Sequence, residues 1–203
     1  MDTSLFGVIV IGLVTLFSIV LHEVAHGYVA YLFKDKTAFL AGRLTLNPFP
    51  HMDIIGSVVV PLASYFLSGT LFGWAKPVPV NTRNLVGRYA DFWVSAAGVL
   101  TNLALASIAF VIAYILLSTG NITKEVGQVL YTVIIVNTSL FLFNLIPIPP
   151  FDGMAILQGL FPKLRIQSAF IYSPFYMIIS LVAASYLYSY LAPSVFRFIL
   201  GPL

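Results

Sequence analysis

The sequence predicts an all-α membrane protein whose chain crosses the bilayer several times. Of its 203 residues, 60% are hydrophobic and 8% are charged, and the mean hydropathy is +0.98. Soluble domains have about 45–50% apolar and about 25% charged residues, so this composition excludes a soluble globular chain. Several apolar runs approach the roughly 20 residues that a helix needs to cross the hydrocarbon core. We therefore expect about four spanning helices in a single integral-membrane domain, residues 1–203.

The first spanning helix is expected over residues 5–33. This run is too long for a cleaved signal peptide, and no positive charge precedes it. A charged and polar stretch follows, and a second apolar run covers residues 54–72, where Pro61 and Gly69 interrupt it. Residues 73–88 are rich in proline and charge, which predicts a loop of extended backbone.

Two confident helices come next, over residues 89–118 and from about 129 to 146. The second one ends at Pro147, the first of three closely spaced prolines. A short amphipathic stretch then leads to a final apolar run over residues 172–191. Three tyrosines near the end of that run suit the interface between membrane and water.

The ten Lys and Arg and the seven Asp and Glu are scattered between the apolar runs. Charges spread in this way orient a membrane chain and form no basic recognition face, so a nucleic-acid partner is not expected. The absence of cysteine excludes disulfides, thiolate metal sites and cysteine nucleophiles.

The sequence His22-Glu23-Val24-Ala25-His26 lies deep in the first apolar run. On a helix, His22 and His26 point to one face, so both rings can reach one metal ion. Neutral imidazoles suit zinc, and Glu23 is placed to take a proton from a metal-bound water. Ionisable residues within hydrocarbon persist mainly where they have a partner or a function. The alternative is a polar packing patch between helices.

A catalytic zinc ion needs a third protein ligand and an open position. Asp152 is the preferred candidate, because it follows a helix end broken by proline, where irregular backbone must be buried in protein or line a polar cavity. Gly153 allows a close approach of the chain there. Asp152 could instead cap the next helix. His51 is expected to be a loop or interface residue, and Asp53 a helix cap.

Asn102 and Asn144 lie inside predicted helices, where an amide must find a partner. Either amide could donate to a developing oxyanion, or it could join two helices by hydrogen bonds. The residues alone leave both interpretations open. Asn137 carries only the ordinary expectation of helix packing.

Two segments carry a resemblance to a known family: His22-Glu23-Val24-Ala25-His26, and the run Asn144-Leu145-Ile146-Pro147-Ile148-Pro149-Pro150-Phe151-Asp152-Gly153. Together they resemble the site-2 protease family of intramembrane zinc metalloproteases. Residues 43–48, 73–81 and 97–102 are similar to its minimal bacterial and archaeal branch, which lacks PDZ and CBS domains. The chain departs from the family at Ile54, Val99 and Phe151, where the family often has proline, proline and leucine.

The resemblance implies that His22, His26 and Asp152 bind one zinc ion per chain and that Glu23 is the general base. It also implies that Asn144 and Asn102 help to position the substrate or to polarise its carbonyl. The expected activity is that of an intramembrane zinc metalloendopeptidase, in which zinc-activated water attacks a peptide bond of a transmembrane segment.

The substrate implied by the resemblance is a transmembrane helix that unwinds locally, because a helical backbone shields its own carbonyls. The loop over residues 74–81 could hold the unwound segment by strand addition. The expected location is the cell membrane of a bacterium or archaeon, with the lipid bilayer as the surrounding partner.

A membrane metal-binding or transport protein could use the same ligands without hydrolysis. The variant Glu23→Gln distinguishes these two functions. In a transporter it should alter metal flux, whereas in a protease turnover should be lost and zinc kept. A di-iron lipid oxidase is excluded, since the three histidines of the chain are too few for two imidazole-rich metal shells.

The distribution of positive charge predicts the topology. If residues 54–72 crossed the membrane once, the ten basic residues would divide evenly between the two faces. If residues 54–88 dip in and return, only Lys124 and Arg197 lie on the far face, and the bias becomes strong. We therefore expect a re-entrant or hairpin element between the helix over residues 5–33 and the helix over residues 89–118, an outside N-terminus and an active site nearer the cytosolic face.

Overall fold

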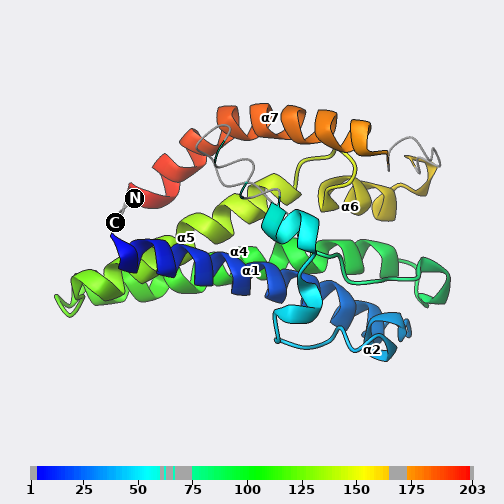
Figure 1. Ribbon diagram of the computed structural model, residues 1–203, viewed down its shortest axis with the longest axis horizontal. Coiled ribbons are helices and arrows are strands. Elements are labelled where there is room, and N and C mark those ends of the chain that lie inside the picture. The colour runs from blue at the N-terminus through cyan, green and yellow to red at the C-terminus, as the bar shows by residue number, and fades with distance from the viewer. Residues whose placement is uncertain (1–3, 60–61, 63–65, 67–74, 165–172, 202–203) are drawn as a thin grey trace.

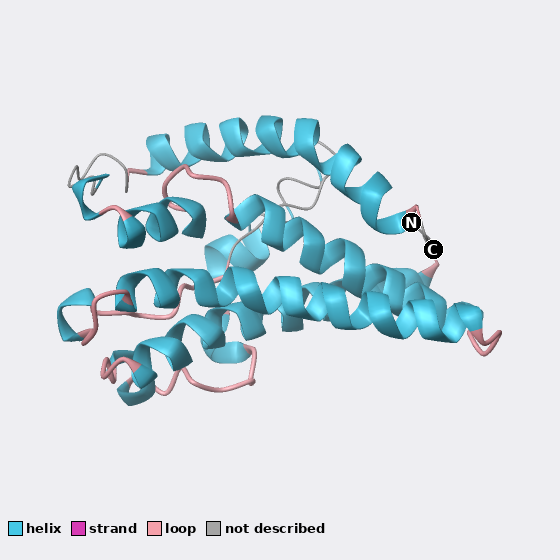
Figure 2. Ribbon diagram, turned by 180° about the vertical axis from the view of Figure 1, so that it is seen from behind, coloured by secondary structure: helices cyan, strands magenta, loops and turns pink. Residues whose placement is uncertain are grey.

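The computed structural model describes residues 4–59, 62, 66, 75–164 and 173–201, and the regular structure of these residues is helical (Figures 1 and 2). Within them, four helices are long and apolar enough to cross a membrane. They are α1 (Leu5–Leu32), α4 (Ala90–Ser118), α5 (Lys124–Asn144) and α7 (Pro174–Leu200). The prediction of an all-α chain with about four spanning helices is confirmed.

Helices α1, α4 and α5 pack together, and α7 lies along one side of them and contacts α5 (Figure 1). Small side chains allow α4 and α5 to approach closely, because Ala109 and Ala113 pack against the fully buried Ile134. Van der Waals packing of this kind holds apolar helices together where lipid provides no hydrophobic driving force. The chain reverses between successive long helices, so consecutive long helices run antiparallel (Figure 1).

Residues 33–89 leave and rejoin this bundle at the same end. The Val86 N–H donates to Phe33 O over 2.9 Å, which places the end of α1 beside the start of α4. The segment contains α2 (Thr37–Leu40), η1 (Phe49–His51), the π-helical turn η2 (Ile55–Val59) and η3 (Thr82–Asn84). Figure 1 shows η2 in cyan along the length of the bundle rather than beyond its end. Most of residues 60–74 lies outside the described residues, so the re-entrant element stays a prediction.

Capping residues explain where several helices begin. Asp53 Oδ1 accepts a hydrogen bond from Gly56 N over 2.7 Å, as expected of a cap. Helix α5 begins earlier than the expected residue 129, because the Thr123 hydroxyl accepts from Val126 N and caps the helix at Lys124.

Helix α7 ends later than predicted, at Leu200 rather than at residue 191. Pro193 lies inside it without ending it. Membrane helices tolerate an internal proline because local adjustments and neighbouring groups satisfy the freed backbone.

A short helix, α6 (Asp152–Leu160), follows α5 and packs against α4, and η4 (Pro162–Leu164) follows it. Glycine makes the close packing of α6 possible. A Cβ on Gly153 would collide with the backbone of Leu145 and would lie 2.7 Å from Ile146 O. The first turn of α6 is therefore held against the end of α5, and this contact positions Asp152.

Candidate metal centre

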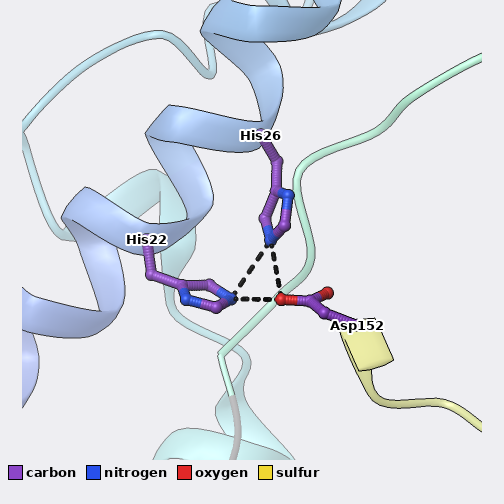
Figure 3. A group of neighbouring side chains, drawn as sticks. All are labelled: His22, His26 and Asp152. Carbon is purple, nitrogen blue, oxygen red and sulfur yellow. Dashed lines mark hydrogen bonds and ion pairs between the residues drawn. The ribbon is translucent and has the colours of Figure 1, made fainter. Parts of the chain in front are cut away.

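Three side chains from two helices converge on one point (Figure 3). His22 and His26 lie one turn apart on α1, and their Nε2 atoms are 3.1 Å apart. Asp152 Oδ2, from the first residue of α6, lies 3.2 Å from each Nε2. Within the described part of the chain, this is the group of His, Asp and Glu that could hold a metal ion. We call it the three-ligand site.

Each histidine ring is held through its other nitrogen. His26 Nδ1 lies 2.7 Å from Val94 O, and His22 Nδ1 lies 2.6 Å from Asn102 Oδ1. A ring nitrogen that faces an oxygen acceptor carries the hydrogen, so in a neutral ring Nε2 keeps its lone pair. Both lone pairs then face the carboxylate oxygen of Asp152, and only a cation or a proton can relieve the repulsion.

The geometry and the donor set fit zinc. Zinc binds imidazole nitrogen and carboxylate oxygen at about 2.0–2.2 Å, so ligands at the corners of a tetrahedron stand about 3.3 Å apart. The observed separations of 3.1–3.2 Å are close to this value. Asp152 Oδ2 is also a buried oxygen without a hydrogen-bond partner, as a metal ligand would be. Two imidazoles and one carboxylate match a known catalytic zinc set.

Asp152 does not cap α6. The N-cap residue is Phe151, and the Asp152 carboxylate points to the histidines instead of to the backbone of its own helix (Figure 3). The alternative interpretation of Asp152 as a cap is therefore not what the structure shows.

The opposite wall of the three-ligand site is Gly98 on α4. A Cβ at this position would lie 2.6 Å from both Cε1 and Nε2 of His22, and closer still to Nε2 of His26. Glycine thus leaves the space next to the two Nε2 atoms open. We had not predicted this role. A glycine in the middle of a long apolar helix was the available signal, because glycine there disfavours the helix and needs a reason.

Glu23 lies next to the three-ligand site, and a non-helical segment over residues 75–81, which we call the extended segment, covers it. The Val78 N–H donates to Glu23 Oε2 over 2.7 Å. Lys76 and Val78 each precede a proline, which restricts both to extended backbone. The extended segment therefore runs directly past the carboxylate that we expect to act as a base.

Polar residues of the preceding loops hold the extended segment in place. Arg43 Nη2 donates to Lys76 O over 2.7 Å, and Lys76 N donates to His51 O over 2.9 Å. His51 is almost fully buried, and its Nε2 lies 2.9 Å from Thr45 O, away from the three-ligand site. His51 is therefore a structural loop residue in this fold.

Asp35 anchors the far end of the extended segment. Its fully buried carboxylate accepts hydrogen bonds from Asn81 N, Asn84 Nδ2, Thr37 N and the Thr37 hydroxyl. Burial alone would raise the pKa of Asp35, but these hydrogen bonds stabilise the charged form and together lower the pKa below the ordinary 3.8. Asp35 therefore stays ionised at neutral pH and ties the extended segment to the end of α1.

A cavity of about 1070 Å³ opens beside the three-ligand site. Its wall includes His22, Glu23, His26, Asp152 and Asn144, together with residues of the extended segment and of α7. The Asn144 amide donates to Leu140 O over 3.0 Å and lies on the cavity wall. Asn144 is thus placed where a bound molecule could reach it.

Asn102 lies elsewhere. It is fully buried between α1, α4 and α5, its Oδ1 faces His22, and its Nδ2 donates to Asn137 over 2.9 Å. It does not belong to the cavity wall. Any role of Asn102 must therefore pass through His22.

Comparisons with known proteins agree with this site. Residues 118–184 match peptidase family M50. A Bacillus subtilis (strain 168) protein named "Putative zinc metalloprotease YwhC" is 41% identical over 165 residues, which cover 78% of this chain and 71% of that protein. A Mycobacterium tuberculosis (strain H37Rv) protein named "Putative zinc metalloprotease Rip2" is 33% identical over 150 residues, which cover 74% of this chain and 55% of that protein. No solved structure matches the chain significantly.

The similarity to the Bacillus protein extends over most of both chains, and the matched family region contains Asp152. It agrees with the resemblance that the two sequence motifs carried and with the four long apolar helices. The chain therefore belongs to peptidase family M50, the site-2 protease family of zinc metalloproteases.

Proposed function

We propose that this protein is an intramembrane zinc metalloendopeptidase that cleaves transmembrane segments of other proteins. The observation that supports it most is the convergence of His22, His26 and Asp152 beside Glu23, on the wall of one cavity. His22, His26 and Asp152 would hold one zinc ion, and Glu23 would act as general base. Four long apolar helices and the family support a location of this chemistry within a membrane.

Zinc bound to these ligands would polarise the scissile carbonyl and make water nucleophilic at neutral pH. Glu23 takes a proton from the attacking water as its oxygen bonds to the carbonyl carbon. Glu23 then gives this proton to the leaving nitrogen as the C–N bond breaks, so one water is consumed for each peptide bond. The carboxylate is half-buried and lies on the cavity wall, where both transfers are within reach.

Asn144 is proposed to orient the substrate carbonyl. Its amide lies on the same cavity wall as the three ligands, and a positioned donor stabilises the negative charge that develops on a carbonyl oxygen. Asn102, which is buried away from the cavity, has no such role in this proposal.

The extended segment is proposed to hold the unwound substrate by strand addition. Along an extended strand, the N–H and C=O groups of successive residues point to opposite edges. The N–H and C=O of Lys76 and the N–H of Val78 point inward, where they bond His51, Arg43 and Glu23.

The outer edge of the extended segment belongs to Pro77 and Pro79, which have no N–H. This edge offers carbonyl acceptors and no donor at these two residues. A substrate must therefore supply the N–H groups of the pairing, and a substrate proline at either paired position would lose a hydrogen bond. Substrate selection would then depend on backbone as well as on side chains.

We place the active site nearer the cytosolic face of a bacterial or archaeal cell membrane. The end of the bundle where α1 finishes also carries α2, η3 and η4 (Figure 1), and with them Lys34, Lys36, Arg83 and Lys163. Lys124 begins α5 at the other end, and Arg197 lies in the last turn of α7. This distribution favours a cytosolic location for the end of the bundle that is rich in Lys and Arg.

The decisive experiment is cleavage of a transmembrane reporter by purified wild type and Glu23→Gln in liposomes, with zinc content measured in both. We expect zinc in both proteins and cleavage by wild type alone, with a loss of about 100-fold or more in Glu23→Gln because a general base is removed. A panel of reporters whose helices are weakened by glycine guards against an unsuitable substrate. Bound zinc without cleavage of any reporter would instead favour a metal-binding or transport protein.

A further inference from the structure

A row of buried polar side chains runs from the three-ligand site into the core, away from the cavity. His22 Nδ1 lies 2.6 Å from Asn102 Oδ1, and Asn102 Nδ2 donates to Asn137 Oδ1 over 2.9 Å. Asn137 Nδ2 donates to the Ser18 hydroxyl over 2.9 Å and to Val133 O over 3.0 Å. Each of these four side chains belongs to a residue at most 7% exposed. We call His22, Asn102, Asn137 and Ser18 the amide relay.

The direction of the amide relay follows from one backbone carbonyl. Val133 O can only accept, so the atom of Asn137 that faces it must be the nitrogen. Asn137 Oδ1 then faces Asn102 and can only accept, so Asn102 must offer its nitrogen. Asn102 Oδ1 is left to face His22, and His22 Nδ1 must therefore carry the hydrogen.

Reversing the hydrogen bonds of the amide relay would be unfavourable at both of its ends. Turning the Asn137 amide would set two acceptor oxygens 3.0 Å apart within the protein interior. Moving the hydrogen of His22 to Nε2 would leave two acceptors 2.6 Å apart. A buried polar group without a partner costs about 1–3 kcal/mol, and more in surroundings of low dielectric.

We propose that Asn137 and Asn102 are positioning residues that fix the tautomer of His22, with Val133 O as the anchor. The amide relay keeps the Nε2 lone pair of His22 directed at His26 and Asp152 before any metal arrives. His26 needs no such relay, since its Nδ1 meets a backbone carbonyl directly. This inference rests on the proposed zinc site, but it does not depend on proteolysis.

The test compares zinc affinity, measured by competition with a chelator, in the full chain in detergent. The main variant is the double substitution Asn102→Leu/Asn137→Leu. Replacing both amides by apolar groups of similar size leaves no orphaned amide, so the loss falls mainly on the ring of His22. Ser18→Ala is the matched control, because it removes one hydrogen bond of the amide relay and leaves the Val133 anchor in place.

We expect the double variant to bind zinc about 10–100-fold more weakly than wild type, as for other groups that orient a metal-binding histidine. Ser18→Ala should remain near wild type. At saturating zinc, reporter cleavage by the double variant should recover in both kcat and KM. Wild-type zinc affinity in the double variant would overturn the proposal. A loss of kcat that zinc does not restore would also overturn it, and would assign Asn102 to the substrate or to packing.

A direct measurement of the tautomer accompanies the affinity. The chain has three histidines, so the ¹⁵N spectrum of histidine-labelled protein is simple, and a His51→Gln sample identifies one ring. In zinc-free wild type, at a pH where the rings are neutral, His22 should carry its hydrogen on Nδ1. In Asn137→Leu we expect a mixture of both tautomers. An unchanged tautomer in this variant would contradict the proposal.

The two proposals can fail separately. A wild type that binds zinc and cleaves no reporter removes the proteolytic function, while the zinc and ¹⁵N measurements still decide the role of the amide relay. A wild type that cleaves its reporter, with a double variant of unchanged zinc affinity, removes the amide relay alone.

Discussion

The metal centre depends on Gly98, because only a residue without a side chain leaves space beside the ligands. Alanine normally stabilises a helix interior by about 0.5–1 kcal/mol relative to glycine. At Gly98 the added Cβ would occupy the space beside the Nε2 atoms of His22 and His26. We predict that Gly98→Ala keeps the helical fold and loses stoichiometric zinc, as measured by metal analysis of the purified protein.

Gly12 provides the matched control, because a Cβ there meets nothing within 4 Å. Gly12→Ala should bind zinc like wild type and cleave the reporter at the same rate. Full zinc binding by Gly98→Ala would mean that the rings of His22 and His26 can move aside at little cost.

Asp35 makes a pH-dependent contribution to stability. Its pKa is lowered in the folded state, so its contribution is fully present above the unfolded value of 3.8. It is lost as the pH falls through the lower folded value. We predict that Asp35→Asn destabilises the protein at neutral pH, and that the difference from wild type shrinks in acid below 3.8. The measurement compares the unfolding midpoints of both proteins from neutral pH to below 3.8. A difference in midpoint that does not change with pH would contradict the prediction.

At the scale of elements, the extended segment docks on α1 through Gly27. A Cβ at this position would lie 2.7 Å from Leu44 Cδ2 and 2.8 Å from Val78 Cγ1. Overpacking of this kind costs about 1–3 kcal/mol. We predict that Gly27→Ala displaces Val78, weakens its hydrogen bond to Glu23 and lowers kcat/KM for the reporter while zinc is retained.

Removing the displaced side chain tests the cause. In Gly27→Ala/Val78→Ala, the space for the new methyl group is restored on one side, so part of the lost kcat/KM should return. If the double variant is no better than Gly27→Ala, the contact with Leu44 rather than with Val78 accounts for the loss.

The sequence predicted the existence of the long helices well, because their apolar runs match the bilayer thickness. The early start of α5 at Lys124 follows from the Thr123 cap, a local signal that polar residues in the first turn obscured. The continuation of α7 past Pro193 could not be read locally, since it depends on surroundings that tolerate a missing hydrogen bond.

Part of the candidate site could likewise be predicted from local sequence, and part could not. His22 and His26 share a helix face by spacing alone, and the structure brings Asp152 within 3.2 Å of both. The amide of Val78 on Glu23 and the amide relay join residues far apart in the chain. Such contacts depend on how helices and loops pack, so no local sequence pattern predicts them.

At the scale of the whole molecule, the arrangement of the bundle predicts which end faces the cytosol. Lys36 follows α1 at one end, and Lys124 begins α5 at the other, and both side chains are exposed. Because the chain has no cysteine, Lys36→Cys and Lys124→Cys each introduce one unique thiol. We predict that a membrane-impermeant maleimide labels Lys124→Cys on intact cells and labels Lys36→Cys only after permeabilisation.

The two possible deviations have different meanings. A reversed labelling pattern would keep the bundle and invert its orientation in the membrane. Labelling of both thiols from the same side would mean that residues 54–72 cross the membrane as well as α4, and would contradict the re-entrant element.

The two prolines of the extended segment also bear on how copies of this protein meet. An exposed strand edge usually attracts another edge like itself, and proteins with such edges aggregate unless something prevents it. Here two copies would bring the carbonyls of Pro77 and Pro79 against each other with no hydrogen between them. In a crowded bilayer, the edge that we propose to pair with a substrate would therefore not pair with the same edge of a second copy.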